Sequence, residues 1–191
     1  MIERNTYITF GKTSDTSIDY LLGILEDART TTLQRVEGIS KKELHWQNAD
    51  GWNTIGALLS HIISCEHFFR IYFIEQRELT KAEIKKLTPG LDMGKYIPQL
   101  ITNQSLQWYV EQMKISNKML LKEIKSLSKA DFYKKRKGYN PKTGYNLAWV
   151  LYHLAEDEVH HRGQISILRK LYKMKALPEL KSVGVKVNVD L

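Results

Sequence analysis

The sequence predicts an all-α protein built as a four-helix bundle. Apolar residues recur at helical spacing in four long segments, and no clear strand pattern separates these segments. The chain has 191 residues, of which 42% are hydrophobic and 26% are charged, as in folded globular proteins. We therefore expect a single domain over residues 1–191 with one core, formed by residues from about 17 to 173.

Apolar stripes mark the first two helices. The first is expected at residues 17–36, closed by Gly38, and the second begins at Asn53, a favourable N-cap residue, and ends near residue 77. The first stripe contains Ile18, Leu21, Leu22, Leu25 and Ala28, and the second contains Ile55, Leu58, Leu59, Ile62, Phe68, Tyr72 and Phe73. Each stripe is the core-facing side of an amphipathic helix.

The third and fourth helices are predicted in the same way. The third covers roughly residues 103–127, where apolar residues alternate with lysines. The fourth begins near Asn146, after the turn-rich stretch GYNPKTGYN, and extends past Leu171. We expect Pro178 to end it.

Glycine and proline predict irregular structure between the second and third helices. Residues 85–100 contain Pro89, Gly90, Gly94 and Pro98, which indicates a long crossover rather than a tight hairpin. The C-terminal tail VGVKVNVDL alternates with period two and is interpreted as a short strand that could pair with TYITF, residues 6–10.

The formal charge of +8 raises the question of an anionic partner. The lysines are scattered, so we interpret them mainly as a solvated surface and expect no nucleic acid as partner. Cys65 is the single cysteine and forms no internal disulfide, and MIERNTYITFGKTSD lacks the apolar core of a signal peptide. No apolar run approaches the ~20 residues of a membrane span. We expect a cytoplasmic protein without membrane contact.

The stretch HLAEDEVHHRGQ, residues 153–164, places ionisable groups on the core-facing stripe of the fourth helix. Asp157 and His161 are four residues apart and can reach one point. His61 lies on the inward face of the second helix, so the three side chains can meet between two helices. One carboxylate and two imidazoles suit a divalent transition metal and leave positions open for water or substrate.

Two other interpretations of these residues remain. Asp157 and His161 could form a neutralised ion pair, with His61 a hydrogen-bonded core residue. Glu158 and His161 also form an ExxH pair, as in di-iron bundles. The chain has no second ExxH pair, which argues against that class.

Two segments carry a family resemblance. GWNTIGALLSHIISCEHFF, residues 51–69, and LAWVLYHLAEDEVHHRGQISILRK, residues 147–170, resemble the signature segments of the DinB/YfiT-like superfamily. The resemblance extends over roughly residues 17–173. It implies a four-helix bundle in up-down-down-up order and a metal, usually zinc or nickel, held by His61, Asp157 and His161. The commonest family pattern has His at position 157, whereas the related thiol-dependent maleylpyruvate isomerases have an acid there.

The resemblance also implies a function. Similar proteins are transferases and isomerases that use a low-molecular-weight thiol such as bacillithiol or mycothiol, and others are described as hydrolases. We therefore expect a metal-dependent enzyme, most simply a bacillithiol-like S-transferase, that acts on a small electrophile and forms a homodimer. The alternative is a non-enzymatic bundle that binds an anionic partner through its basic surface, with the metal structural or absent.

Several neighbours of the predicted ligands have open roles. Cys65, one turn after His61, is a fourth ligand, a reactive thiol or a packing residue. His160 lies at the edge of the stripe, His153 is a candidate for the pocket mouth, and Gln164 could orient a ligand. Trp46, Trp52 and Trp149 either line the pocket or pack in the ordinary way.

Overall fold

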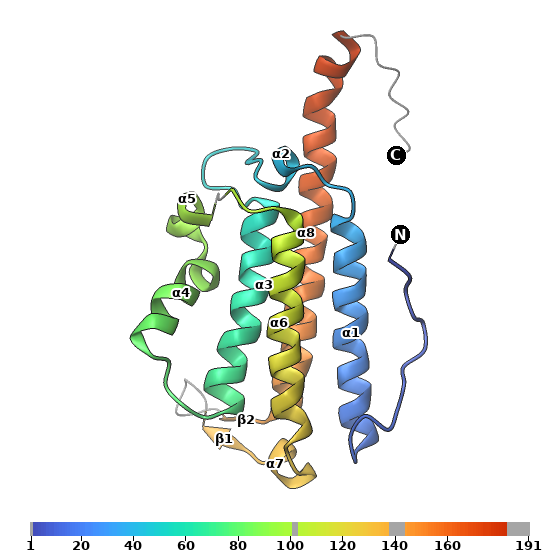
Figure 1. Ribbon diagram of the computed structural model, residues 1–191, viewed down its shortest axis with the longest axis vertical. Helices are drawn as coiled ribbons and strands as arrows, with labels where there is room; N and C mark the ends of the chain where they lie inside the picture. The colour runs from blue at the N-terminus through green and yellow to red at the C-terminus, as the bar shows by residue number, and fades with distance from the viewer. Residues whose placement is uncertain (1, 101–102, 138–143, 183–191) are drawn as a thin grey trace.

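The computed structural model describes residues 2–100, 103–137 and 144–182 (Figure 1). It confirms an all-α protein, because helices account for 71% of the chain. Within the described ranges the only strands are β1 (Arg136–Lys137) and β2 (Gly144–Tyr145), which pair antiparallel. No helix in these ranges is long and apolar enough to cross a membrane.

Four long helices dominate the fold: α1 (Thr16–Val36), α3 (Ile55–Phe69), α6 (Leu106–Lys125) and α8 (Leu147–Ser182). They lie side by side in Figure 1, where α1 and α8 run upward along the chain and α3 and α6 run downward. The short helices α2 (Lys41–Leu44) and α7 (Lys129–Tyr133), which the sequence analysis did not predict, lie in the connections at opposite ends.

Side-chain caps fix where three of the long helices begin. Asp15, Thr54 and Ser105 each accept hydrogen bonds from backbone N–H groups in the first turn of α1, α3 and α6. The cap of α3 is thus Thr54, and the prediction of Asn53 was wrong by one residue. Beyond Phe69 the second predicted helix continues as a π-helix, η1 (Arg70–Ile74).

The connection between α3 and α6 is more helical than predicted. Instead of an irregular segment it contains α4 (Lys81–Asp92), the 3-10 helix η2 (Gly94–Tyr96) and α5 (Ile97–Leu100). A capping box of Thr80 and Glu83 starts α4, and the helix continues through Pro89 because its packing on α3 outweighs the backbone hydrogen bond that the proline removes. Figure 1 shows α4 beside α3.

Two further predictions about the chain ends change. Pro178 does not end the fourth helix, since α8 continues through it to Ser182. The proline again removes a single backbone donor, here close to the helix end. Residues 6–10 form no strand, and the predicted C-terminal strand lies outside the described residues.

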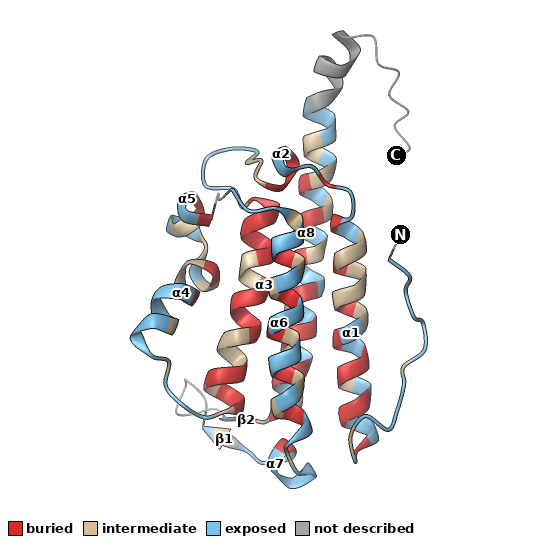
Figure 2. Cartoon of the chain, viewed as in Figure 1, coloured by how far each residue is buried: buried red, intermediate tan, exposed pale blue. Residues whose placement is uncertain are grey.

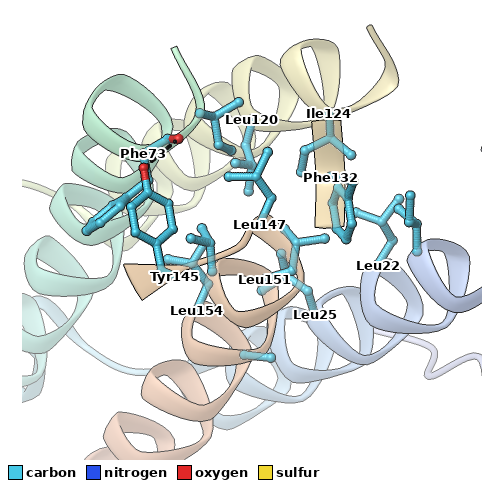
Figure 3. Packing of buried hydrophobic residues seen from close by; sticks show 14 of the residues in the cluster. Leu22, Leu25, Phe73, Leu120, Ile124, Phe132, Tyr145, Leu147, Leu151 and Leu154 are labelled. Atoms are coloured by element: carbon cyan, nitrogen blue, oxygen red, sulfur yellow. Dashed lines mark hydrogen bonds between the residues drawn. The ribbon is translucent and has the colours of Figure 1, made fainter. Parts of the chain in front are cut away.

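The buried residues lie mainly along the inner faces of the four long helices (Figure 2) and form two hydrophobic clusters along their length. The cluster nearer the β1–β2 hairpin, shown in Figure 3, includes Leu22, Leu25, Phe73, Leu120, Ile124, Phe132, Tyr145, Leu147, Leu151 and Leu154. The cluster nearer α2 includes Val36, Leu44, Ile55, Leu58, Leu59, Ile62, Tyr109, Met113, Ile165 and Leu168. On α1, α6 and α8, the residues between the two clusters include buried polar groups.

Candidate metal centre

The predicted ligands lie in this polar layer, where α3 faces α8. Nε2 of His61 is 3.6 Å from Oδ2 of Asp157, and Nε2 of His161 is 3.3 Å from Oδ1 of the same carboxylate. The two imidazole rings meet edge to face with centroids 4.5 Å apart. The three side chains thus come together from two successive turns of α8, which carry Asp157 and His161, and from one turn of α3, which carries His61.

A hydrogen bond at Nδ1, on the side of the ring away from Asp157, fixes the orientation of each imidazole. Nδ1 of His61 lies 2.8 Å from the carbonyl oxygen of Gly90 in α4, and Nδ1 of His161 lies 2.9 Å from Oε1 of Gln164. Since a carbonyl oxygen only accepts, each Nδ1 donates its proton to that partner. In the neutral imidazole Nε2 is then unprotonated, and its lone pair faces Asp157.

Cys65 adjoins the same atoms from α3. Its sulfur lies 3.3 Å from Nε2 of His61, one helical turn away. His61, Cys65 and Asp157 form a group whose ligand atoms all lie within 4.8 Å of one another. This group contains Cys65 where the sequence-based set has His161, and the two sets share His61 and Asp157.

The electrostatics of the centre favour a cation. Burial opposes the charge of Asp157, but its contacts with His161 and His61 outweigh burial and hold its pKa well below the ordinary 3.8. Burial also lowers the pKa of His61, yet Asp157 and the Gly90 carbonyl raise it above 6.5 overall. Burial and the charge of Asp157 raise the pKa of the Cys65 thiol. Asp157 therefore stays ionised and attracts positive charge.

The spacing of the donor atoms fits a metal ion. Nitrogen and oxygen ligands of a tetrahedral zinc lie about 3.4 Å apart, given Zn–ligand bonds of about 2.0–2.2 Å. The observed separations, 3.6 Å from His61 to Oδ2 and 3.3 Å from His161 to Oδ1, are close to this value, and each histidine faces a different oxygen of Asp157. They exceed the about 2.7–2.9 Å of a charge-assisted hydrogen bond, so an ion pair alone accounts for them less well.

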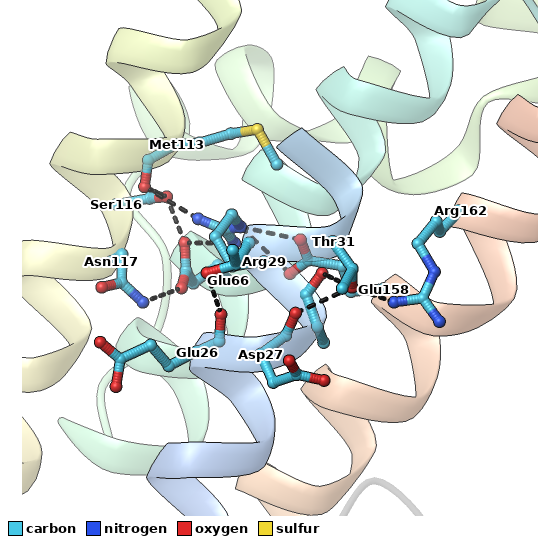
Figure 4. Close-up of polar contacts among 12 residues, drawn as sticks. Glu26, Asp27, Arg29, Thr31, Glu66, Met113, Ser116, Asn117, Glu158 and Arg162 are labelled. Atoms are coloured by element: carbon cyan, nitrogen blue, oxygen red, sulfur yellow. Dashed lines mark hydrogen bonds and ion pairs between the residues drawn. The ribbon is translucent and has the colours of Figure 1, made fainter. Parts of the chain in front are cut away.

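A second buried cluster, which the sequence analysis missed, lies beside the centre (Figure 4). Arg29 of α1 donates from Nε to Glu158 of α8 at 2.8 Å, and its Nη2 lies 3.4 Å from Glu66 of α3. The side chains of Glu66 and Glu158 are only 2% and 1% exposed, so Arg29 neutralises charge that would otherwise be buried alone. We call Arg29, Glu66 and Glu158 the ion cluster.

Helix α6 completes this cluster. Ser116 and Asn117 donate to the carboxylate of Glu66, and the backbone carbonyl of Met113 accepts from Arg29 at 3.1 Å. Burial and the nearby Glu66 raise the pKa of Glu158 more than Arg29 lowers it. All four long helices therefore contribute to one polar layer. A signal existed in the sequence, because position 29 lies on the stripe of Leu22 and Leu25 at spacings of seven and four.

The two other histidines of α8 that the sequence analysis considered, His160 and His153, lie outside the proposed ligand set. His160 is exposed, its Nε2 lies 3.0 Å from the amide nitrogen of Gln164, and its ring meets that of His161 edge to face with centroids 5.0 Å apart. His153 stacks on Trp149 with ring centroids 4.8 Å apart, and Phe69 packs against His153 at 5.3 Å.

The other two tryptophans lie elsewhere. Trp46 packs edge-on against Tyr172 with centroids 5.5 Å apart, and Trp52 is exposed. Both precede α3, at the end of the molecule near α2. Their contacts are those of packing and surface residues, which favours the second of the roles considered for them.

Comparison with known proteins gives one clear match. No curated protein sequence matches the chain. The sequence profile of the DinB superfamily matches residues 24–165, which include all of α3 and α6 and the part of α8 that carries Asp157 and His161. The chain belongs to the DinB superfamily.

Proposed function

We propose that this protein is a metal-dependent enzyme whose centre consists of His61, Asp157 and His161, and that it activates a low-molecular-weight thiol such as bacillithiol, or water, for attack on a small electrophile. Membership of a superfamily that is typically metal-dependent supports this proposal. The proposed scaffold is the up-down-down-up bundle, with α4, η2 and α5 as its crossover; the helix directions in Figure 1 support it.

One observation carries the proposal: Nδ1 of each histidine meets a carbonyl oxygen while Nε2 faces Asp157. Metal-binding histidines show this arrangement because the outer partner fixes the tautomer and the ring orientation. A buried histidine with only a structural role needs hydrogen-bond partners, but it does not require two histidines to turn Nε2 toward the same carboxylate.

Each residue of the proposed centre has a distinct role in binding the metal. His61 and His161 present neutral nitrogens, Asp157 supplies the negative charge, and Gly90 and Gln164 hold the rings in place. Asp157 is 21% exposed, so a small ligand can approach from its side. A divalent cation bound there would supply Lewis acidity, which lowers the pKa of a thiol or water at neutral pH.

Metal titration tests the ligand set before any substrate is known. Wild-type protein stripped with chelator should bind about one equivalent of zinc or nickel, and His61→Ala and Asp157→Ala should bind neither ion tightly. His160→Ala is the matched control, because it removes an exposed imidazole next to His161 and should bind as wild type does. Equal metal binding by all four proteins would exclude this ligand set.

Activity is tested next. We expect turnover of an electrophile in the presence of bacillithiol by the metal-loaded wild type and none by His61→Ala. If the protein bound the metal but catalysed no reaction with a thiol or with water, the metal would have a structural role.

A second function rests on a separate observation. Lys114, Lys118, Lys122 and Lys125 line a surface groove on α6 together with Asn117 and Leu121. Such a basic groove suits an anionic partner. Binding to an anionic polymer that weakens steeply with salt, and that is lost on replacing the four lysines with glutamine, would favour this function.

We also propose a cytoplasmic homodimer. Large apolar side chains are exposed on α1 and α8: Tyr20, Ile24, Trp149, Tyr152, Val159 and Ile167. Their burial between two copies would be favourable. Light scattering with size-exclusion chromatography should give twice the 22.3 kDa chain mass, and a monomer at high concentration would exclude the dimer.

A further inference from the structure

We propose that Cys65 is a fourth protein ligand of the cation, which makes the centre a His₂-Asp-Cys site selective for zinc, to which the thiol or water of the proposed function would add as a fifth ligand. This inference rests on the metal centre proposed above. It assigns to the chain's single cysteine a role that neither the family membership nor the three-residue ligand set requires.

Helix geometry places two donor pairs opposite each other. His61 and Cys65 are four residues apart on α3, and Asp157 and His161 are four residues apart on α8, so each helix offers two donors on one face. Asp157 links the pairs, because its two oxygens lie 3.6 Å from His61 and 3.3 Å from His161.

The position of the sulfur fits coordination. Nitrogen and sulfur ligands of a tetrahedral zinc lie about 3.6 Å apart, given Zn–N of about 2.0–2.1 Å and Zn–S of about 2.3 Å. Sγ of Cys65 lies 3.3 Å from Nε2 of His61, and it belongs to the group with Asp157 whose donor atoms are within 4.8 Å. The contact is made with the nitrogen that the Gly90 carbonyl leaves unprotonated.

Charge balance gives the sulfur a reason to bind. Two neutral imidazoles and one carboxylate leave a divalent ion with a net charge of +1 in a largely buried layer, and buried net charge is costly. When a sulfur–metal bond forms, the S–H bond breaks, its electron pair stays on sulfur and its proton passes to solvent. The resulting thiolate makes the centre neutral.

The ligand set then selects the metal. Thiolate together with imidazole in a tetrahedral arrangement suits zinc, whereas nickel favours square-planar or octahedral sites. Replacement of the sulfur should therefore reduce the preference for zinc over nickel.

Cobalt(II) tests the sulfur directly, because a cobalt–thiolate bond gives a charge-transfer band in the near ultraviolet. The chain has one cysteine, so in thiol-free buffer the band can come only from Cys65. Chelator-stripped wild type titrated with cobalt(II) should show the band, and Cys65→Ser should lack it. Ser64→Ala, a buried neighbour on α3, is the matched control and should keep the band.

The outcomes separate this inference from the function on which it rests. Stoichiometric cobalt binding by wild type without the band would overturn the role of Cys65 and leave the three-residue centre intact. Wild type that binds no cobalt or zinc would overturn both. X-ray absorption of the zinc-loaded wild type needs no variant: it should give one sulfur at about 2.3 Å, and a shell of nitrogen and oxygen alone would contradict the proposal.

Discussion

The carbonyl oxygen of Gly90 lies 2.8 Å from Nδ1 of His61, which joins helix α4 to the candidate metal centre. Glycine is required there by space, because a Cβ atom at position 90 would lie 2.8 Å from the carbonyl oxygen of Ser60 and would collide with the hydroxyl of Ser64. The approach of α4 to α3 therefore controls the orientation of a proposed ligand.

We predict that Gly90→Ala lowers metal affinity by about 10- to 100-fold, because α4 must move and His61 then loses its outer partner. Zinc titration of the chelator-stripped variant measures this. Gly163→Ala is a matched control: a Cβ there meets no atom within 4 Å, so metal affinity should not change. Equal affinities of both variants and wild type would show that Gly90 does not position His61.

Gln164→Leu should weaken metal binding by a similar factor, because His161 then lacks the acceptor 2.9 Å from its Nδ1. Leucine keeps most of the side-chain volume and removes the amide. His160→Ala tests the other side of the same amide, where the contact is with an exposed ring, and should bind metal normally. If Gln164→Leu bound as tightly as wild type, the tautomer of His161 would not depend on Gln164.

Arg29→Met should lower the free energy of unfolding by about 3–5 kcal/mol, because Glu66 and Glu158 remain buried without their counter-ion. Urea unfolding at pH 7 measures the loss, which should shrink at lower pH as the carboxylates become protonated. Arg4→Met is the control, since it breaks an exposed ion pair with Asp27 and should have little effect. A small loss for Arg29→Met would mean that water reaches the carboxylates.

The pH dependence of the metal-free protein should have a definite sign. The raised pKa of His61 contributes stability that is fully present below 6.5 and is lost as the pH rises through the folded-state value. The lowered pKa of Asp157 contributes stability that is present above 3.8 and is lost as the pH falls through its folded-state value. Wild type should therefore exceed His61→Ala in stability most clearly between about pH 4 and 6.5.

Zinc affinity should rise with pH in the region where the stability contributed by His61 in the metal-free protein falls. His61 must lose its proton before Nε2 can bind a cation, so zinc affinity should rise with pH through the raised pKa of His61. Titrations at pH 5.5, 6.5, 7.5 and 8.5 measure the slope. A pH-independent affinity would indicate that His61 is not a ligand.

Apolar spacing predicted the long helices well because each buries one continuous stripe. The first predicted helix, residues 17–36, differs from α1 by one residue. The same reasoning predicted that His61, Asp157 and His161 lie close together, since a residue on a core-facing stripe must meet the facing helix. The identity of a bound metal, and the catalytic role, stay predictions.

Contacts across the chain could not be predicted from local spacing. Pro89 and Gly90 indicated an irregular segment, yet α4 forms and packs on α3, because tertiary packing outweighs the loss of one hydrogen bond. The ion cluster was missed for a related reason. Three charges on separate helices look like surface residues until the facing helices are known, and only their positions on apolar stripes reveal them.

Adjacent residues on two helices serve the metal centre and the ion cluster. Cys65 and Glu66 are neighbours on α3, as are Asp157 and Glu158 on α8, and successive residues of a helix point about 100° apart. A single-residue insertion or deletion upstream of either pair in its helix would turn both side chains away together. A substitution in the polar layer therefore affects one cluster at a time, whereas a shift in the register of α3 or α8 removes residues from both clusters at once.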